Sequence, residues 1–330
     1  MAAGVLALAT PLAAQTQASG ADYRAQFDTT LGTEVRQPQT FDAVYQNAFE
    51  QRIAELAEGT RGRIGVAAMD LSTGQRISVL GDQRFPMAST SKIAVAATFL
   101  EGVEKGRWSL TSKFPLLLPS RSARFSTKVA PVYEGERMAA IDLIEIMITR
   151  SSNPATDALL RVVGGPKEVN AWMRRQGIRE FSIDRDIATL VRDDGQYNPA
   201  NHIDPRDSAT PNAMLTLLTG LYQGKHLSAE SRRVLLGAMS RTRTGKRRIP
   251  ALMPAGVRVS HKTGSLNNTS SDVGILELPD GRAIAVAIYV TGQGTRLDRE
   301  AKIAQLARAI HDGYAAQRAR VLTGANYGGQ

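Results

Sequence analysis

Cysteine is absent from this chain of 330 residues. Its absence excludes disulfide bonds, metal sites built on thiolates and a lipid anchor attached through cysteine. The four histidines show no metal-ligand spacing, so we expect neither a metal nor another cofactor. They are His202, His226, His261 and His311.

Hydrophobic runs long enough to span a bilayer are also absent. One shorter apolar stretch covers residues 2–14, and small and polar residues follow it, with possible processing points after Ala14 and near Gly20. Except for a missing basic start, this pattern is typical of a secretory signal peptide. We therefore predict a signal peptide over residues 1–20, a linker over residues 21–40, export to a bacterial periplasm and no stable membrane insertion.

The net charge of +10 raises nucleic-acid binding as a possible function. The basic residues are scattered, however, and the densest cluster, at residues 241–248, belongs to no nucleic-acid-binding motif. We interpret this cluster as a solvated loop and expect no nucleic-acid partner.

The apolar periodicity predicts an α+β fold. A helix and a strand hairpin come first, helices fill the middle, and three strands and a helix end the chain. The expected architecture is an antiparallel sheet built from both chain ends and flanked by helices, with an inserted all-helical subdomain. The expected parts are an α/β subdomain at 41–86 and 240–316, a helical subdomain at 87–239 and a tail at 317–330.

The first motif is Ser89 followed three residues later by Lys92. Apolar residues recur at helical spacing after Met87, and residues at i and i+3 lie on one helix face, so amine and hydroxyl can meet. A serine becomes a nucleophile when a neighbouring base takes its proton. Burial among apolar side chains lowers the pKa of a lysine toward that role. The alternative is a capping serine beside a solvated lysine.

Two further motifs follow along the chain. Ser151 and Asn153, at i and i+2, can present a hydroxyl and an amide together, although the same segment can also be a helix N-cap. His261-Lys262-Thr263-Gly264-Ser265 ends an apolar strand, where a lysine and hydroxyls suit the binding of a carboxylate. Gly264 would let a substrate backbone lie close to that strand.

In this order and spacing, the three motifs resemble those of a class A serine β-lactamase, a member of the penicillin-recognising serine enzymes. The resemblance covers residues 41–316. It implies that Ser89 is the acylated nucleophile and Lys92 its general base. It also implies that Ser151 passes a proton to the β-lactam nitrogen and that Asn153 holds the substrate side chain. Ser152 departs from the family, which has Asp at that position.

The resemblance also assigns the strand motif. Lys262, Thr263 and Ser265 would bind the substrate carboxylate, and the backbone N–H groups of Ser89 and Ser265 would form the oxyanion hole. No metal takes part.

The family hydrolyses its acyl-enzyme with a water held by Glu and by an Asn four residues later, on an omega loop. Asp184 and Arg185 match the pair that opens this loop, and Asp207 matches the residue that closes it. Counted back from Asp207, Asp194 takes the position of the Glu and Asn198 that of the Asn. Because the two alignments differ by seven residues, we predict an insertion of seven residues before Asp194.

Two points stay open in this loop. Either Arg185 or Arg192 can form the closing salt bridge with Asp207. Asp193 and Asp194 can also be plain turn residues.

The resemblance implies a periplasmic serine hydrolase that opens β-lactams through acyl-Ser89, with slow deacylation because Asp is shorter than Glu. Two alternatives share most of its residues. One is a D-alanyl-D-alanine peptidase, and the other is a penicillin-binding sensor that acylates without efficient turnover. The expected partner is a small-molecule β-lactam or a cell-wall peptide, and the expected state is a monomer.

Overall fold

A computed structural model gives the structure of residues 47–327, with side chains to residue 317. The predicted signal peptide (1–20) and linker (21–40) lie outside the described residues. Within residues 47–327, no helix is both long and apolar enough to cross a membrane.

The centre of the fold is a five-stranded antiparallel sheet in the order β2-β1-β10-β9-β8. Its strands are β1 (Gly62–Asp70), β2 (Arg76–Val79), β8 (Arg258–Leu266), β9 (Thr269–Glu277) and β10 (Ala283–Gly292). Strand β1 pairs with β10 along nine residue pairs, from Gly62↔Gly292 to Asp70↔Ile284. A strand from the N-terminal part of the chain and one from the C-terminal part therefore lie side by side in the middle of the sheet. This confirms the predicted fold class.

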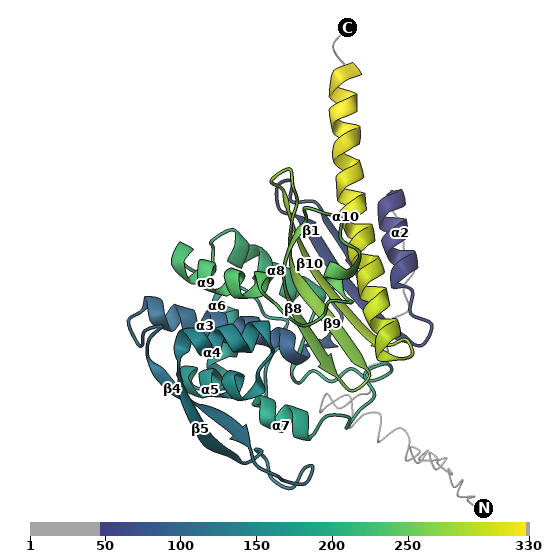
Figure 1. Cartoon of the computed structure of the whole chain (residues 1–330). Helices are drawn as coiled ribbons and strands as arrows, with labels where there is room; N and C mark the ends of the chain where they lie inside the picture. The colour runs from purple at the N-terminus through teal and green to yellow at the C-terminus, as the bar shows by residue number, and fades with distance from the viewer. Residues whose placement is uncertain (1–46, 328–330) are drawn as a thin grey trace, which may run out of the picture. The chain divides into compact units, whose positions relative to one another are not determined.

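Helices α2 (Ala48–Ala57) and α10 (Arg296–Tyr327) cover one face of the sheet, as Figure 1 shows. Side chains alternate along a strand, so Ile64 and Val66 of β1 point to this face and pack in a core with Ile303. Ala67 and Met69 point to the other face and belong to a second core.

The second core lies between the sheet and the inserted helices. Helix α8 (Pro211–Tyr222) contacts the sheet directly, at β1 and β10. Helix α3 (Lys92–Glu104) is buried along nearly its whole length, as expected for a helix that is apolar on all sides. Around α3 lie α4 (Ala140–Thr149), α5 (Asn153–Val163), α6 (Pro166–Arg175) and α9 (Ala229–Ser240).

Three details differ from the sequence prediction. The inserted subdomain, expected to be all helical, also contains a two-stranded sheet of β4 (Lys113–Pro119) and β5 (Val132–Ala139). Around the expected omega loop lie α7 (Ile187–Arg192) and the short strands β6 (Phe181–Ser182) and β7 (Ser208–Ala209), and β7 pairs with both β6 and β3 (Phe85–Pro86). The predicted tail begins inside α10, which continues to Tyr327 because Ala, Arg, Gln and Leu favour a helix.

Candidate active site

Ser89 lies in a single 3₁₀ turn, η1 (Ala88–Ser91), directly before α3. The neighbouring hydroxyls are tied to the backbone: Thr90 donates to the Met87 carbonyl and Ser91 to the Ala88 carbonyl, both at 2.8 Å. The partly exposed Ser89 hydroxyl has no hydrogen bond to any residue in the described part of the chain. Ser89 is therefore the hydroxyl of this turn that is free to react.

The turn is held in an unusual backbone conformation against strand β8. Ala88 has φ +49°, a left-handed value that costs energy for a residue with a side chain. A Cβ on Gly264 would lie 2.5 Å from the Met87 carbonyl oxygen, which is too close for an unstrained contact. Gly264 was predicted to let a substrate backbone lie close to the strand. In the structure, its missing side chain also lets the turn that carries Ser89 pack against the strand.

Lys92 is fully buried at the start of α3, and its amine faces the second motif. The Nζ atom donates to the Ser151 carbonyl at 2.8 Å, to Ser151 Oγ at 3.2 Å and to Asn153 Oδ1 at 2.7 Å. Burial lowers the pKa of Lys92 well below its ordinary value, and the charge of Lys262 lowers it further. Both effects favour the neutral form of the amine, which is the form that can accept a proton. In this structure it is bonded to Ser151 and Asn153 rather than to Ser89.

Ser151 stands between two lysine amines. Its Oγ atom is 3.2 Å from Lys92 Nζ and 3.0 Å from Lys262 Nζ. Its backbone is held at φ +60°, again a left-handed value for a residue other than glycine. This geometry lets one hydroxyl pass a proton outward and recover one from either amine.

Both readings of the second motif apply, but to different residues. Ser152 is the N-cap of α5, where its Oγ accepts the Ala155 N–H at 3.3 Å. Asn153 begins the helix and directs its side-chain oxygen to Lys92. The residue that differs from the family pattern is therefore the one with the structural role.

Lys262 is fully buried on β8, where burial lowers its pKa to about 7. Along the same strand, Thr263 and Ser265 carry hydroxyls with defined partners. Thr263 Oγ1 lies 2.7 Å from Thr244 Oγ1, and Ser265 Oγ accepts from Arg248 at 2.6 Å. Together these groups form a shelf of hydroxyls and cations, defined here as Thr244, Arg248, Lys262, Thr263 and Ser265.

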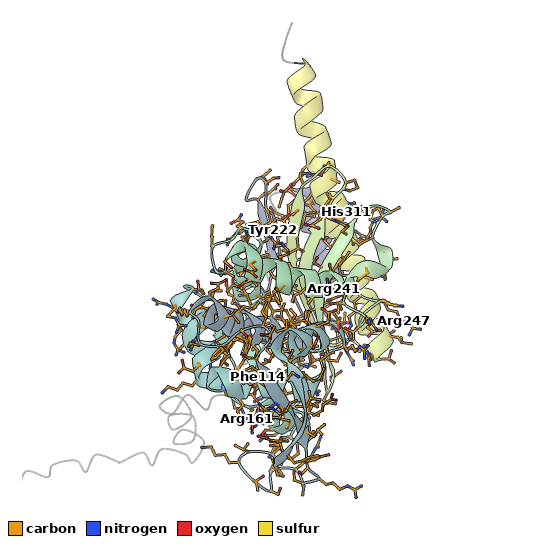
Figure 2. The ribbon with its side chains drawn as sticks, turned by 60° about the vertical axis from the view of Figure 1, so that its left-hand side comes forward. Phe114, Arg161, Tyr222, Arg241, Arg247 and His311 are labelled. Atoms are coloured by element: carbon orange, nitrogen blue, oxygen red, sulfur yellow. The ribbon has the colours of Figure 1, made fainter. Side chains whose placement is uncertain are left out.

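Arg248 was missed from the sequence, where residues 241–248 were interpreted as a solvated loop. Arg241 and Arg247 are indeed exposed (Figure 2), but Arg248 is only 1% exposed. Its guanidinium donates to the carbonyls of Gly264 and Ser271 and pairs with Glu300 at 3.1 Å. The one available signal was its position before the apolar Ile249, which favours burial where the chain leaves the loop.

The loop expected to correspond to the omega loop is closed by an ion pair between Arg185 and Asp207 at 2.6 Å. Asp207 also accepts the backbone N–H groups of Asp184 and Arg185. Arg192, the other candidate partner, instead pairs with Asp193 at 2.8 Å.

Asp157 fixes the start of α7 in this loop to the buried helix α5. Its two carboxylate oxygens accept the N–H groups of Ile187 at 2.7 Å and Ala188 at 2.9 Å. Burial raises the pKa of Asp157 to about 6, and its negative charge raises the pKa of Lys92 in turn. The sequence analysis did not single out this residue.

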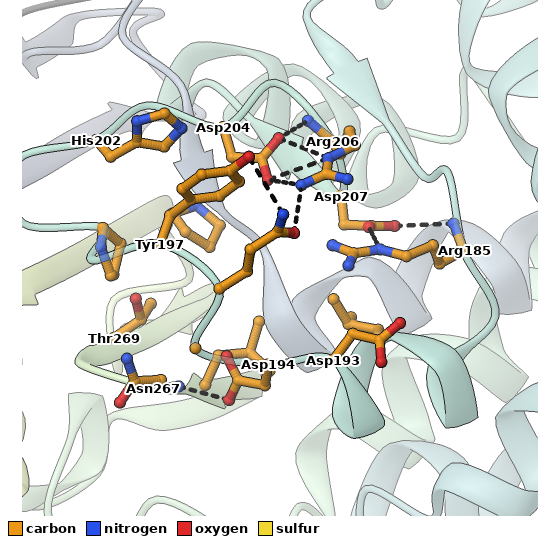
Figure 3. Close-up of a pocket in the computed structure, with 16 residues that line it drawn as sticks. Arg185, Asp193, Asp194, Tyr197, His202, Asp204, Arg206, Asp207, Asn267 and Thr269 are labelled. Atoms are coloured by element: carbon orange, nitrogen blue, oxygen red, sulfur yellow. Dashed lines mark hydrogen bonds and ion pairs between the residues drawn. The ribbon is translucent and has the colours of Figure 1, made fainter. Parts of the chain in front are cut away.

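Asp194 and Asn198 lie beside the turn between β8 and β9, as Figure 3 shows for Asp194 and Asn267. Asp194 Oδ2 accepts the Asn267 N–H at 2.7 Å, and the Asp194 carbonyl accepts from Arg124. Asn198 Oδ1 accepts from the Asn268 amide at 2.8 Å. Within residues 47–327, no hydrogen bond joins Asp194 or Asn198 to Ser89 or Lys92.

A small cavity of about 70 Å³ lies behind this segment. Its lining includes Tyr197 and His202, whose rings stack with centroids 4.1 Å apart, and the ion pair of Asp204 and Arg206. Among the residues that the structure describes, no group of three or more His, Asp and Glu side chains is arranged to hold a metal ion.

The comparison with known proteins agrees with the fold and the site. The sequence profile of the β-lactamase enzyme family matches residues 48–314. The chain is 31% identical to β-lactamase SME-1 of Serratia marcescens over 74% of this chain and 81% of the relative. It is also 31% identical to β-lactamase CTX-M-8 of Citrobacter amalonaticus, over 81% and 90%.

Solved structures give the same result. A reconstructed ancestral class A β-lactamase of Gram-negative bacteria has a TM-score of 0.70 and 35% identity, over 80% of this chain and 99% of the other. A β-lactamase from Chitinophaga pinensis has a TM-score of 0.71 and 30% identity, over 81% and 100%. The fold and the matched chains define a serine hydrolase of the penicillin-recognising kind.

The chain belongs to the β-lactamase enzyme family, and within it to class A. It is therefore a hydrolase that acts on β-lactams.

Asp157→Asn tests how the buried acid acts on Lys92. Because the charge of Asp157 raises the pKa of Lys92, its removal lowers that pKa further. A general base must be deprotonated, so the acidic limb of the kcat/KM profile should move to lower pH. Asp142→Asn, which removes an exposed acid from the first turn of α4, is the control and should leave the limb in place. A limb that stays unmoved in Asp157→Asn would contradict this electrostatic link.

Proposed function

We propose that the protein is a periplasmic β-lactamase that works through an acyl-Ser89 intermediate, with deacylation slower than acylation. The observation that carries the proposal is the shared Ser151 hydroxyl, which lies within 3.2 Å of both Lys92 Nζ and Lys262 Nζ. Acyl transfer needs a nucleophile, a base that takes its proton and an acid that protonates the leaving group. Ser89, Lys92 and Ser151 can supply these three functions.

Acylation follows from these groups. Neutral Lys92 takes the Ser89 proton as Ser89 Oγ attacks the β-lactam carbonyl carbon, and the carbonyl oxygen becomes an oxyanion. The backbone N–H groups of Ser89 and Ser265 stabilise this charge. On collapse the carbonyl–nitrogen bond breaks, Ser151 gives its proton to the nitrogen, and Lys92 returns a proton to Ser151. The product is an ester on Ser89.

The shelf of Thr244, Arg248, Lys262, Thr263 and Ser265 binds the carboxylate of the substrate. Two buried basic side chains and three hydroxyls, contributed by β8 and by residues 244–248, match the charge and the hydrogen-bonding capacity of a carboxylate. The guanidinium of Arg248 adds a second cation to the Lys262 of the strand motif. Asn153 holds the amide side chain of the substrate beside Lys92.

Deacylation is the slower step because its base, Asp194, lies on the loop closed by Arg185 and Asp207. Asp194 Oδ1 has no hydrogen bond to the described residues and can accept one from a water molecule. Asp194 Oδ2 accepts the Asn267 N–H. Asp is one methylene shorter than the Glu of the family, and a misplacement of about 1 Å can cost on the order of 100-fold in rate.

A D-alanyl-D-alanine peptidase or a penicillin-binding sensor would use the same acylating residues. The lifetime of the acyl-enzyme separates the three functions, since it is short for a lactamase and hours or longer for a sensor. Release of D-alanine from a D-Ala-D-Ala peptide would identify the peptidase.

A penicillin should add its whole mass to Ser89, because the adjacent hydroxyls of the turn are bonded to the backbone. Time-resolved intact mass with peptide mapping measures the adduct and its decay. Ser89→Ala should form no adduct, whereas Ser91→Ala, the matched control, should still form it on Ser89. An adduct on any other residue would refute the assignment of the nucleophile.

Asp194→Asn should leave the rate of acylation nearly intact and make the Ser89 adduct persist, because the amide cannot take a proton from water. Stopped-flow acylation and adduct decay by mass spectrometry separate the two rates. Asp204→Asn, in the same loop and paired with Arg206, is the control. If Asp194→Asn turns over penicillin as fast as the parent, the loop assignment is wrong and Lys92 or another group activates the water.

Export should remove the start of the chain after Ala14 or within a few residues of Gly20. N-terminal sequencing of the protein from a periplasmic fraction measures the site. Finding residues 1–14 intact on protein from the cytoplasm would count against both processing and localisation.

A further inference from the structure

Asp272 is a fully buried acid on β9 that the reaction described above does not use. In the register of the sheet it lies opposite Thr263 on β8. Its oxygens lie 2.8 and 2.9 Å from His261 Nδ1, and Oδ2 also accepts the Ile249 N–H at 3.2 Å. The carboxylate therefore links the ring of His261 on β8 to the backbone of Ile249.

Both partners of Asp272 are next in sequence to a cation of the shelf. His261 precedes Lys262 on β8, and Ile249 follows Arg248 at the start of η2 (Ile249–Leu252). The carboxylate therefore holds the backbone segments of both cations from behind the strand. A carboxylate fixed by two such contacts constrains where each cation can lie.

Among the described residues, the hydrogen-bond partners of Lys262 are Ser151 Oγ and the Thr263 carbonyl, and neither is a carboxylate. Burial lowers its pKa to about 7, the charge of Asp272 opposes that fall, and the charge of Arg248 adds to it. The other charged or titratable groups around this part of the site come from different elements. They are Lys92 on α3, His261 on β8 and, bonded to Arg248, Glu300 on α10.

We propose that Asp272, held by His261, is a positioning residue for the substrate carboxylate: it fixes the segments that carry Arg248 and Lys262, and its negative charge favours the protonated Lys262 that binds a carboxylate. The proposal rests on the proposed function, in which Lys262 binds the carboxylate. Asp272 acts through its neighbours, because its carboxylate is engaged by His261 Nδ1 and the Ile249 N–H.

The test is the pH profile of kcat/KM for a penicillin with a free carboxylate, in the parent and in Asp272→Asn. Lys262 must be protonated to bind the carboxylate, so activity falls as pH rises through its pKa, and kcat/KM reports the free enzyme. Without the negative charge this basic limb should move to lower pH. The variant should be near the parent at pH 5 and about tenfold lower at pH 8, mainly through KM.

Three comparisons separate the charge from a general loss of structure. His261→Gln keeps the Asp272 charge, so its basic limb should remain where the parent has it. Asp70→Asn removes another buried acid, which binds Ser72 and Arg282, and should also leave the limb in place. The methyl ester of the same penicillin has no carboxylate, so Asp272→Asn should reduce its kcat/KM by the same factor at every pH or not at all.

The results also separate this proposal from the proposed function. If the parent forms no Ser89 adduct, the proposed function fails. If the parent hydrolyses penicillin and Asp272→Asn lowers kcat/KM equally at all pH values, or His261→Gln moves the limb as far, the role of Asp272 is refuted alone. Should circular dichroism show that Asp272→Asn is unfolded, Asp272→Ser, which is smaller and also uncharged, is measured in its place.

Discussion

Two buried lysines that share one hydroxyl determine the rest of this site. Lys92 and Lys262 both donate to Ser151 Oγ, and in the described part of the chain neither amine is hydrogen-bonded to a carboxylate. Burying an ammonium without a direct counter-ion is costly, so burial lowers the pKa of both lysines. For Lys92 the shift favours the neutral amine that the proposed general base needs. For Lys262 it means that a bound carboxylate, as proposed, would supply the missing counter-ion and favour the protonated amine.

The two acids whose charges act on these lysines are not hydrogen-bonded to them in the described part of the chain. They bind neighbouring parts of the fold instead. Asp157 fixes α7 through Ile187 and Ala188, and Asp272 fixes β8 through His261. A carboxylate in direct contact with an amine would hold it protonated and remove a base. An acid farther away shifts the pKa only in part, so the same side chain can anchor a backbone segment and adjust a charge.

The sequence was most informative where one segment carries the whole signal. Helix α8 (Pro211–Tyr222) shows such a signal, because its apolar period is uninterrupted and Thr210 caps it. Strand β4 was missed because prolines within it at 115 and 119 argue against a strand. For Arg248 the sequence offers at most a signal for burial, and the roles of Arg248 and Asp272 depend on partners 11 or more residues away that no local pattern encodes.

The omega loop shows the same limit for the site itself. Counting back from Asp207 gives Asp194 a position in the chain but no direction for its side chain, and the structure places that carboxylate on the Asn267 N–H. The groups proposed for acylation lie on a buried helix and on the sheet, whereas Asp194, proposed for deacylation, lies on a partly exposed loop. Loops tolerate sequence change better than the elements they connect. Because the proposed base for deacylation lies on such a loop, changes in the loop should alter the lifetime of the ester more than its formation.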